Sequence, residues 1–201
     1  MNIAICIPAR DTVHTAFTRS LCNLTNRLVQ RSINFDVHFV MSSVICDART
    51  QLVQIALQKN HTHILWLDTD MHFPPNILEK LLEHSKDIVA CNYSTRYTPH
   101  RPVAFLDKHN IDKRLTEGTG LHKVWAVGMG CMLVDIEIYK KLPPPWFDHI
   151  YNKIEKNYSG EDVSFCDYVN NNGYEIYVDS DISSKVAHIG IGIHTLENVK
   201  E

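Results

Sequence analysis

Two carboxylates directly follow an apolar run in the sequence Leu65-Trp66-Leu67-Asp68-Thr69-Asp70. Side chains two apart in extended backbone point the same way, so Asp68 and Asp70 can converge on one point. Carboxylates held close together repel unless a proton or a cation intervenes. Hard divalent cations such as Mg²⁺ or Mn²⁺ prefer carboxylate and phosphate oxygens. The spacing therefore favours a divalent metal site, and the alternative is a polar strand end in which Asp70 starts the turn toward Pro74.

A second acidic pair, Glu161 and Asp162, follows Ser159 and Gly160. Serine three residues before an acidic residue is the pattern of a helix capping box, and acidic side chains are stabilising in a first helical turn. The chemical alternative is that one carboxylate faces a cleft and acts as a general base toward an attacking hydroxyl. The pattern by itself favours the cap, and both roles can coexist on different residues.

Two arginines lie where predicted strands or helices join. Arg10 follows the first predicted strand, and Arg49 lies in the first turn of a helix for which Asp47 is the expected N-cap. A cation at a helix N-terminus opposes the helix dipole, and an anion bound there reverses the penalty. Each arginine could equally pair with a neighbouring aspartate.

His188 and the segment Gly128-Met129-Gly130 each allow two interpretations. Neutral imidazole is a common metal ligand, but a lone histidine beside an apolar run, here Val186-Ala187, is more often a packed side chain. The glycines form either a simple turn or the wall of a sugar pocket, where absent side chains leave room. They do not form a phosphate-binding glycine loop, because neither Gly-x-x-x-x-Gly-Lys nor Gly-x-Gly-x-x-Gly occurs there.

The elements that must position these residues alternate between strand and helix up to residue 92. Apolar runs predict strands at 3–7, 35–41, 63–67 and 87–91, and helices at 13–29, after Asp47 and after Pro74-Pro75. This order is typical of an α/β fold with a mostly parallel sheet between helices. Ligands of such sheets bind beyond the carboxyl ends of the strands, where Arg10, Asp68 and Asp70 fall. Farther along, the sequence predicts helices at 136–142 and from about 160, and a strand at 175–178.

Composition narrows the class of protein. The chain has 201 residues, of which 44% are hydrophobic, and a formal net charge of -3. The charge argues against nucleic-acid binding through phosphate neutralisation. The six cysteines contain no Cys-x-x-Cys, as expected of reduced core thiols. No signal sequence and no stretch of membrane-spanning length is present, so we expect a soluble, cytoplasmic protein with no membrane span.

Taken in order, these motifs resemble those of glycosyltransferases with the GT-A fold, near family 2 and its small bacterial, phage and viral relatives. Six segments carry the resemblance: 7–10, 47–50, 65–70, 128–133, 160–165 and 188–190. Two positions depart from the pattern, since Ser42-Ser43 stands where an acidic residue is frequent and Thr50 where asparagine is frequent. The resemblance implies a single GT-A catalytic domain, in which residues 1–92 form the nucleotide-binding half and residues 93–201 the acceptor and catalytic half.

The resemblance also implies roles for the matching residues. The nucleotide would be bound by Pro8, Ala9, Arg10, Arg49, Asp68, Thr69 and Asp70. Asp70 and His188, with help from Asp68, would hold Mn²⁺ or Mg²⁺ against the diphosphate. Asp162, with Glu161 beside it, would be the catalytic base, and Gly128, Met129 and Gly130 would border the donor sugar and the acceptor.

The reaction so implied moves a sugar from a nucleoside-diphosphate sugar, in this family most often a UDP-sugar, to an acceptor hydroxyl of a glycan, lipid or protein. Inversion is slightly favoured over retention. One alternative is a sugar nucleotidyltransferase, although Ile7-Pro8-Ala9-Arg10-Asp11 lacks the glycine-rich, basic loop of most such enzymes. The other is a non-catalytic nucleotide-sugar-binding module, against which the intact Asp68, Asp70, Asp162 and His188 argue.

Overall fold

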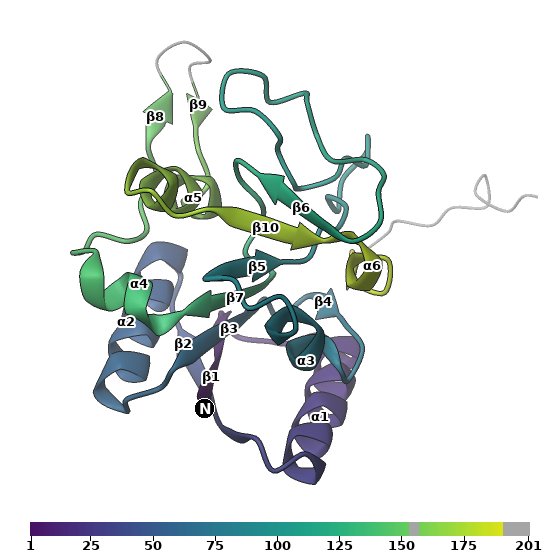
Figure 1. Ribbon diagram of the computed structural model, residues 1–201, viewed down its shortest axis with the longest axis vertical. Coiled ribbons are helices and arrows are strands. Elements are labelled where there is room, and N and C mark those ends of the chain that lie inside the picture. Colours follow the sequence, from purple (N-terminus) through teal and green to yellow (C-terminus); the bar gives the residue numbers. More distant parts are fainter. Residues whose placement is uncertain (153–156, 191–201) are drawn as a thin grey trace, which may run out of the picture.

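The computed structural model describes residues 1–152 and 157–190, which form an α/β fold around a seven-stranded sheet (Figure 1). The strand order is β2-β1-β3-β7-β5-β10-β6. In chain order the strands are β1 (Asn2–Ala9), β2 (Asn34–Met41), β3 (His63–Leu67), β5 (Ile88–Ala90), β6 (Leu121–Val124), β7 (Cys131–Asp135) and β10 (Ile176–Asp179). Strands β6 and β7 run antiparallel to their neighbours, and the other five share one direction.

Helices cover both faces of this sheet (Figure 1). One face is covered by α1 (Thr15–Gln30), α3 (Ile77–Leu82) and α6 (Ser180–Ser183), and the other by α2 (Ile45–Gln58), α4 (Ile136–Lys141) and α5 (Glu161–Asn171). Two short antiparallel pairs lie outside the sheet: β4 (Met71–His72) with β11 (Ala187–His188), and β8 (Tyr151–Asn152) with β9 (Asn157–Tyr158).

The central strands are apolar throughout because both of their faces are buried. In β1, Ile3, Ile5 and Ile7 pack in the cluster of α1 and α3, whereas Ala4 and Cys6 pack in the cluster of α2. This alternation follows from the two-residue period of extended backbone. The predicted α/β class with a mostly parallel sheet is thereby confirmed.

Strand β7 is the main departure from a simple parallel order. The sequence predicts four strands in succession before residue 92, but β5 does not pair with β3. Instead, β7 lies between them and pairs antiparallel with both, with Leu133 opposite Leu65 on one side and Val89 on the other.

None of the helices in the described part of the chain combines the length and hydrophobicity that a membrane crossing requires.

Two predicted helix caps are wrong. Helix α2 begins at Ile45 with Val44 as its N-cap, so Asp47 lies within the first turn and Arg49 in the second. Helix α5 begins after Gly160, and no side chain caps it. The Ser159 hydroxyl does not bind the backbone amides of the first turn of α5. Its Oγ lies 3.0 Å from Ser164 Oγ and donates to the carbonyl of Ile150. The observed N-caps, Val44 and Gly160, are in extended conformation and supply no side-chain cap.

Candidate functional site

A cleft of about 760 Å³ opens beyond the carboxyl ends of β1, β2 and β3, beside the start of α2. We call it the strand-end cleft. Among its lining residues are six of the seven predicted nucleotide-binding residues, namely Pro8, Ala9, Arg10, Asp68, Thr69 and Asp70, joined by Ser42, Ser43, Arg96 and His149; the seventh, Arg49, does not line it. This edge is where an α/β sheet binds its ligands. The structure therefore brings together predicted residues from Pro8 to Asp70, which are up to 62 positions apart in the chain, as the strand order requires.

Asp70 and His188 meet at this edge through the β4–β11 pair. His188 lies opposite Met71 in that pair, and the next amide, Ile189 N, donates to Asp70 O at 2.7 Å. The two side chains approach to 3.3 Å between His188 Nε2 and Asp70 Oδ2. His188 Nδ1 lies 3.1 Å from the carbonyl oxygen of Ser94, so it must carry the proton that this contact needs. Nε2 faces Asp70 Oδ2: when it carries a proton it donates to that carboxylate, and without the proton its lone pair can bind a metal.

The geometry of this pair fits a divalent cation. Two ligands at right angles around a cation, each about 2.1 Å from it, lie about 3 Å apart. The 3.3 Å between His188 Nε2 and Asp70 Oδ2 is close to that value. Burial opposes ionisation of Asp70, but the hydrogen bond and charge of His188, together with Arg96, outweigh it and lower the pKa of Asp70. The carboxylate is therefore charged at neutral pH.

Arg96 is a site residue that sequence reasoning missed. Its Nη1 donates to Asp70 Oδ2 at 2.7 Å, the same oxygen that faces His188. The Arg96 side chain is 41% exposed, so it can move aside for a cation. No pattern marked Arg96, because it lies in a polar segment without hydrophobic periodicity.

Asp68 lies apart from Asp70 and His188 and pairs with Arg49. Among the residues the structure describes, these three do not form a group whose donor atoms all lie within 4.8 Å of one another. Arg49 is 1% exposed; its Nη2 donates to Asp68 Oδ1 at 3.0 Å and its Nε to Glu161 Oε1 at 3.2 Å. Its guanidinium also lies over the Trp66 ring, 5.2 Å from the centroid. Arg49 therefore neutralises two partly buried acids of the chain, and its Nη1 is buried without a hydrogen-bond partner among the described residues.

Asp162 is the carboxylate that remains available next to this pair. Burial, followed by the charge of Glu161, raises the pKa of Asp162 to about 6. Its Oδ1 accepts from the backbone amide of Val163 at 2.8 Å, whereas Glu161 is bound by Arg49. A general base works best with a pKa near the operating pH. Of the two predicted acids, the structure thus leaves Asp162 with the properties of a base.

The glycines of Gly128-Met129-Gly130 are buried against Tyr93. The Tyr93 hydroxyl accepts from Gly130 N at 2.9 Å, and a Cβ added at Gly128 or Gly130 would lie 2.5 or 2.6 Å from that oxygen. The room left by the missing side chains is therefore occupied by the Tyr93 phenol. Tyr93 also packs edge-on against His188, with ring centroids 5.4 Å apart, so the glycines support the position of that histidine.

We expect Gly130→Ala to lower the free energy of unfolding by about 1–3 kcal/mol, the usual cost of overpacking. Chemical denaturation at neutral pH measures this loss. In a double-mutant cycle, Tyr93→Phe removes the closest atom, so the double variant should lose less than the sum of the two single losses. Strictly additive losses would show that the Tyr93 hydroxyl is not the obstacle.

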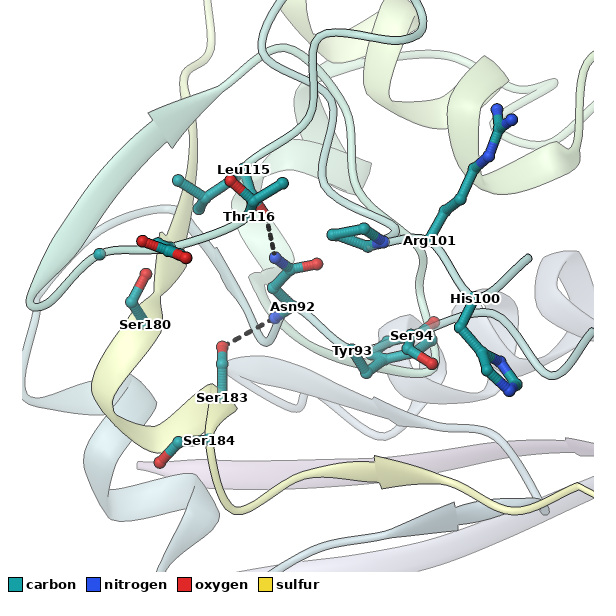
Figure 2. A pocket seen from close by; sticks show the side chains of 13 residues that line it. Asn92, Tyr93, Ser94, His100, Arg101, Leu115, Thr116, Ser180, Ser183 and Ser184 are labelled. Carbon is teal, nitrogen blue, oxygen red and sulfur yellow. Dashed lines mark hydrogen bonds between the residues drawn. The ribbon is translucent and has the colours of Figure 1, made fainter. Parts of the chain in front are cut away.

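A second cavity of about 350 Å³ lies on the other side of Tyr93, between the segment after β5 and helix α6 (Figure 2). Asn92 holds its wall together: Nδ2 donates to Leu115 O at 2.7 Å, and the backbone N donates to Ser183 Oγ at 2.8 Å. Arg101 and His100 supply polar groups at its rim (Figure 2). Tyr93 lines this cavity and contacts His188, so the two sites adjoin.

The fold of this chain is similar to those of several solved structures. The protein A197 from STIV is 15% identical, with a TM-score of 0.59, and the alignment covers 98% of each chain. A glycosyltransferase involved in the glycosylation of the major capsid of PBCV-1 is 14% identical, with a TM-score of 0.51 over 96% of this chain and 95% of that one. The nucleoside-diphosphate-sugar pyrophosphorylase from Vibrio cholerae RC9 is 11% identical, with a TM-score of 0.51 over 92% and 93%. The chain has a glycosyltransferase-like fold.

Sequence comparison gives one partial match. The family model described as Anp1, a glycosyltransferase-related family, matches residues 24–113, which is less than half of the chain. That segment runs from α1 through the Asp68–Asp70 strand end to the loop after β5. No curated protein sequence matches the chain.

Proposed function

We propose that this protein is a metal-dependent glycosyltransferase that moves a sugar from a nucleoside-diphosphate sugar to an acceptor hydroxyl. The observation that carries the proposal is the Asp70–His188 pair, whose facing atoms lie 3.3 Å apart at the strand-end cleft. The fold likeness to a glycosyltransferase and the partial Anp1 match support the same class. Residues 1–92 supply most of the nucleotide side of one catalytic domain, and residues 93–201 supply Asp162, His188 and the acceptor side.

In the proposed reaction, each residue acts on charge or on a proton. Bound Mn²⁺ or Mg²⁺ would supply positive charge that stabilises the diphosphate leaving group. Asp70 Oδ2 and His188 Nε2 would hold this cation, and the exposed side chain of Arg10 on the cleft wall would add positive charge beside the phosphates. Asp162 accepts the proton of the acceptor hydroxyl as that oxygen attacks the anomeric carbon, with inversion of configuration. The cavity beside Tyr93 provides the approach for the acceptor.

The proposal is tested with a panel of sugar nucleotides, UDP-sugars first, in the presence of Mn²⁺ or Mg²⁺. We expect one donor to release free nucleoside diphosphate in a metal-dependent manner. Asp70→Asn should raise the metal concentration for half-maximal release by at least about tenfold, because it removes one charged protein ligand. The control is Asp87→Asn, an exposed acid that precedes β5 at the opposite end of the sheet from the cleft. Equal metal dependence in both variants would overturn the assignment of Asp70.

A nucleotidyltransferase is the second candidate, because the fold is also similar to that of a nucleoside-diphosphate-sugar pyrophosphorylase. The products separate the two reactions. A nucleotidyltransferase releases pyrophosphate when supplied with a nucleoside triphosphate and a sugar 1-phosphate, whereas a glycosyltransferase releases nucleoside diphosphate from its donor. Tight donor binding without either product would instead identify a binding module.

A further inference from the structure

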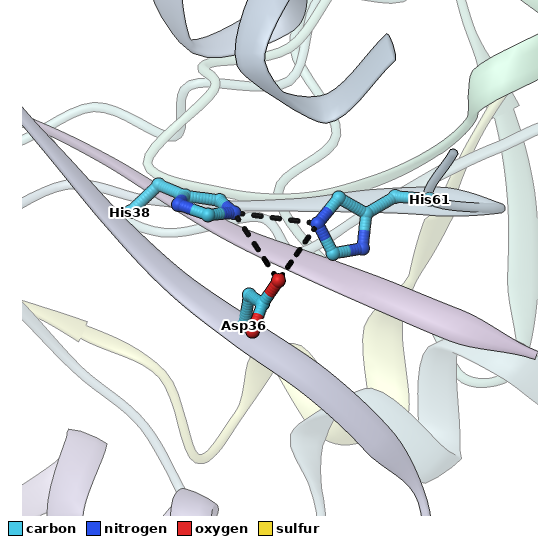
Figure 3. A group of neighbouring side chains, drawn as sticks. All are labelled: Asp36, His38 and His61. Carbon is cyan, nitrogen blue, oxygen red and sulfur yellow. Dashed lines mark hydrogen bonds and ion pairs between the residues drawn. The ribbon is translucent and has the colours of Figure 1, made fainter. Parts of the chain in front are cut away.

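A cluster of two histidines and an aspartate lies away from the strand-end cleft, on the α2 side of the sheet. Asp36 and His38 are two residues apart on β2 and share one face, and His61 follows the end of α2. Figure 3 shows the three side chains pointing at one another from these two segments. The proposed sugar transfer uses none of them.

The distances in this cluster are those of metal ligands. His38 Nε2 lies 3.3 Å from His61 Nε2. Asp36 Oδ2 lies 3.4 Å from His61 Nε2 and 3.9 Å from His38 Nε2. Ligands at about 2.0–2.2 Å from a tetrahedral Zn²⁺ lie about 3.3–3.6 Å from one another. The two imidazoles are already at that separation, and the carboxylate needs to move by only a fraction of an ångström.

Burial prepares the two imidazoles as ligands. The His61 side chain is fully buried and that of His38 is 11% exposed, whereas that of Asp36 is 48% exposed. Because the two Nε2 atoms face each other at hydrogen-bond distance, one must accept where the other donates, which leaves a lone pair directed into the cluster. The exposed side beside Asp36 is open to a water as fourth ligand.

Lys59 is the cation that now balances Asp36. Its Nζ lies 3.4 Å from Asp36 Oδ2, and its side chain is 53% exposed. An exposed lysine can turn into solvent at little cost, because surface ion pairs contribute only about 0–1 kcal/mol. Lys59 therefore competes with a metal for Asp36 but does not block the site.

We infer that Asp36, His38 and His61 form a second metal site, specific for Zn²⁺ or a similar borderline transition metal, that is separate from the proposed catalytic cation. Imidazole nitrogen selects such metals over Mg²⁺, which prefers a shell of oxygen ligands. The bound ion joins the edge strand β2 to the turn between α2 and β3. Because it binds the folded chain, it raises stability by mass action.

The test is equilibrium dialysis of the untagged protein against buffered Zn²⁺, with Mg²⁺ in excess. We expect Zn²⁺ to bind this site and the melting temperature to rise. Asp36→Asn and His38→Gln should each weaken Zn²⁺ binding by more than about 100-fold, the upper end of what loss of an outer-shell partner costs. Asp70→Asn should leave this binding intact, which separates the inference from the proposed catalytic site.

His63→Gln is the matched control, since His63 is a half-buried strand histidine that lies outside the cluster. Unchanged Zn²⁺ affinity in Asp36→Asn and His38→Gln would overturn the site, as would the absence of Zn²⁺ binding to the wild-type protein. Asp36 is exposed, so Asp36→Asn is not expected to disturb folding, and circular dichroism checks this.

Discussion

Replacing Asp162 with asparagine should lower kcat/KM for sugar transfer by about 10²–10⁴-fold, the range of general base catalysis. The amide keeps the shape of the side chain but cannot accept the proton of the acceptor hydroxyl. Asp167→Asn is the control, because Asp167 lies on the same helix and pairs with Lys108 on the surface. A variant Asp162→Asn with near-normal turnover would exclude this residue as the base and favour a retaining mechanism without a protein base.

The pH dependence of the same reaction provides a second measurement. The base must be ionised, and the pKa of Asp162 is raised to about 6. The value of kcat/KM should therefore be at its plateau above pH 7 and fall tenfold per pH unit below about 6. Asp162→Asn should lose this limb and also gain stability at pH 7. A carboxyl whose folded pKa is raised above its unfolded value costs stability above the folded pKa, here about 1–3 kcal/mol.

Replacing Arg49 with methionine should lower the free energy of unfolding at pH 7 by about 3–5 kcal/mol, the usual cost of removing one partner from a buried ion pair. The substitution leaves Asp68 and Glu161 facing each other without their cation, and it removes the stacking of the guanidinium on Trp66. Urea denaturation measures the loss. Because the pKa of Asp68 is already raised by burial, the variant should recover part of its stability as the pH falls and this acid becomes protonated.

Arg27→Met is the matched control for this change. Arg27 also forms an ion pair, with Glu79, but its side chain is 32% exposed. Surface pairs contribute about 0–1 kcal/mol, so its loss should be several times smaller. Equal losses in the two variants would show that Arg49 is not the cation that holds the two acids.

The fold was largely predictable because each central strand is a short apolar run buried on both faces. The strand-end position of Asp68 and Asp70 followed from the same pattern. The location of β7 was not predictable from it, because pairing between β3 and residues 131–135 depends on distant contacts that local periodicity does not encode. The two caps were misassigned because aspartate and serine are residue types typical of caps, whereas α2 starts two residues before Asp47 and the Ser159 hydroxyl contacts Ile150 and Ser164 instead.

The sequence predicted which residue types form the site better than it predicted which of these residues contact one another. Asp70 and His188 meet because β4 and β11 pair, a contact across more than 110 positions of the chain that no spacing rule reveals. Asp68 has the same side chain as Asp70, but it forms an ion pair with the buried Arg49. Its position two residues before Asp70 did not predict this difference. Tyr93 and Arg96 escaped notice because the polar segment after β5 has no periodic signal.

The position of β7 has a consequence for the order in which the chain can fold. Strand β5 pairs with β7 on one side and with β10 on the other. It is synthesised some 40 residues before β7 and some 85 residues before β10. During synthesis at about 5–20 residues per second, β3 and β5 therefore wait for seconds with unpaired backbone edges. Such edges invite pairing with other chains. The first 92 residues contain most of the nucleotide cleft and the paired strands β2, β1 and β3, yet β5 cannot join this sheet until β7 arrives from the second half of the chain.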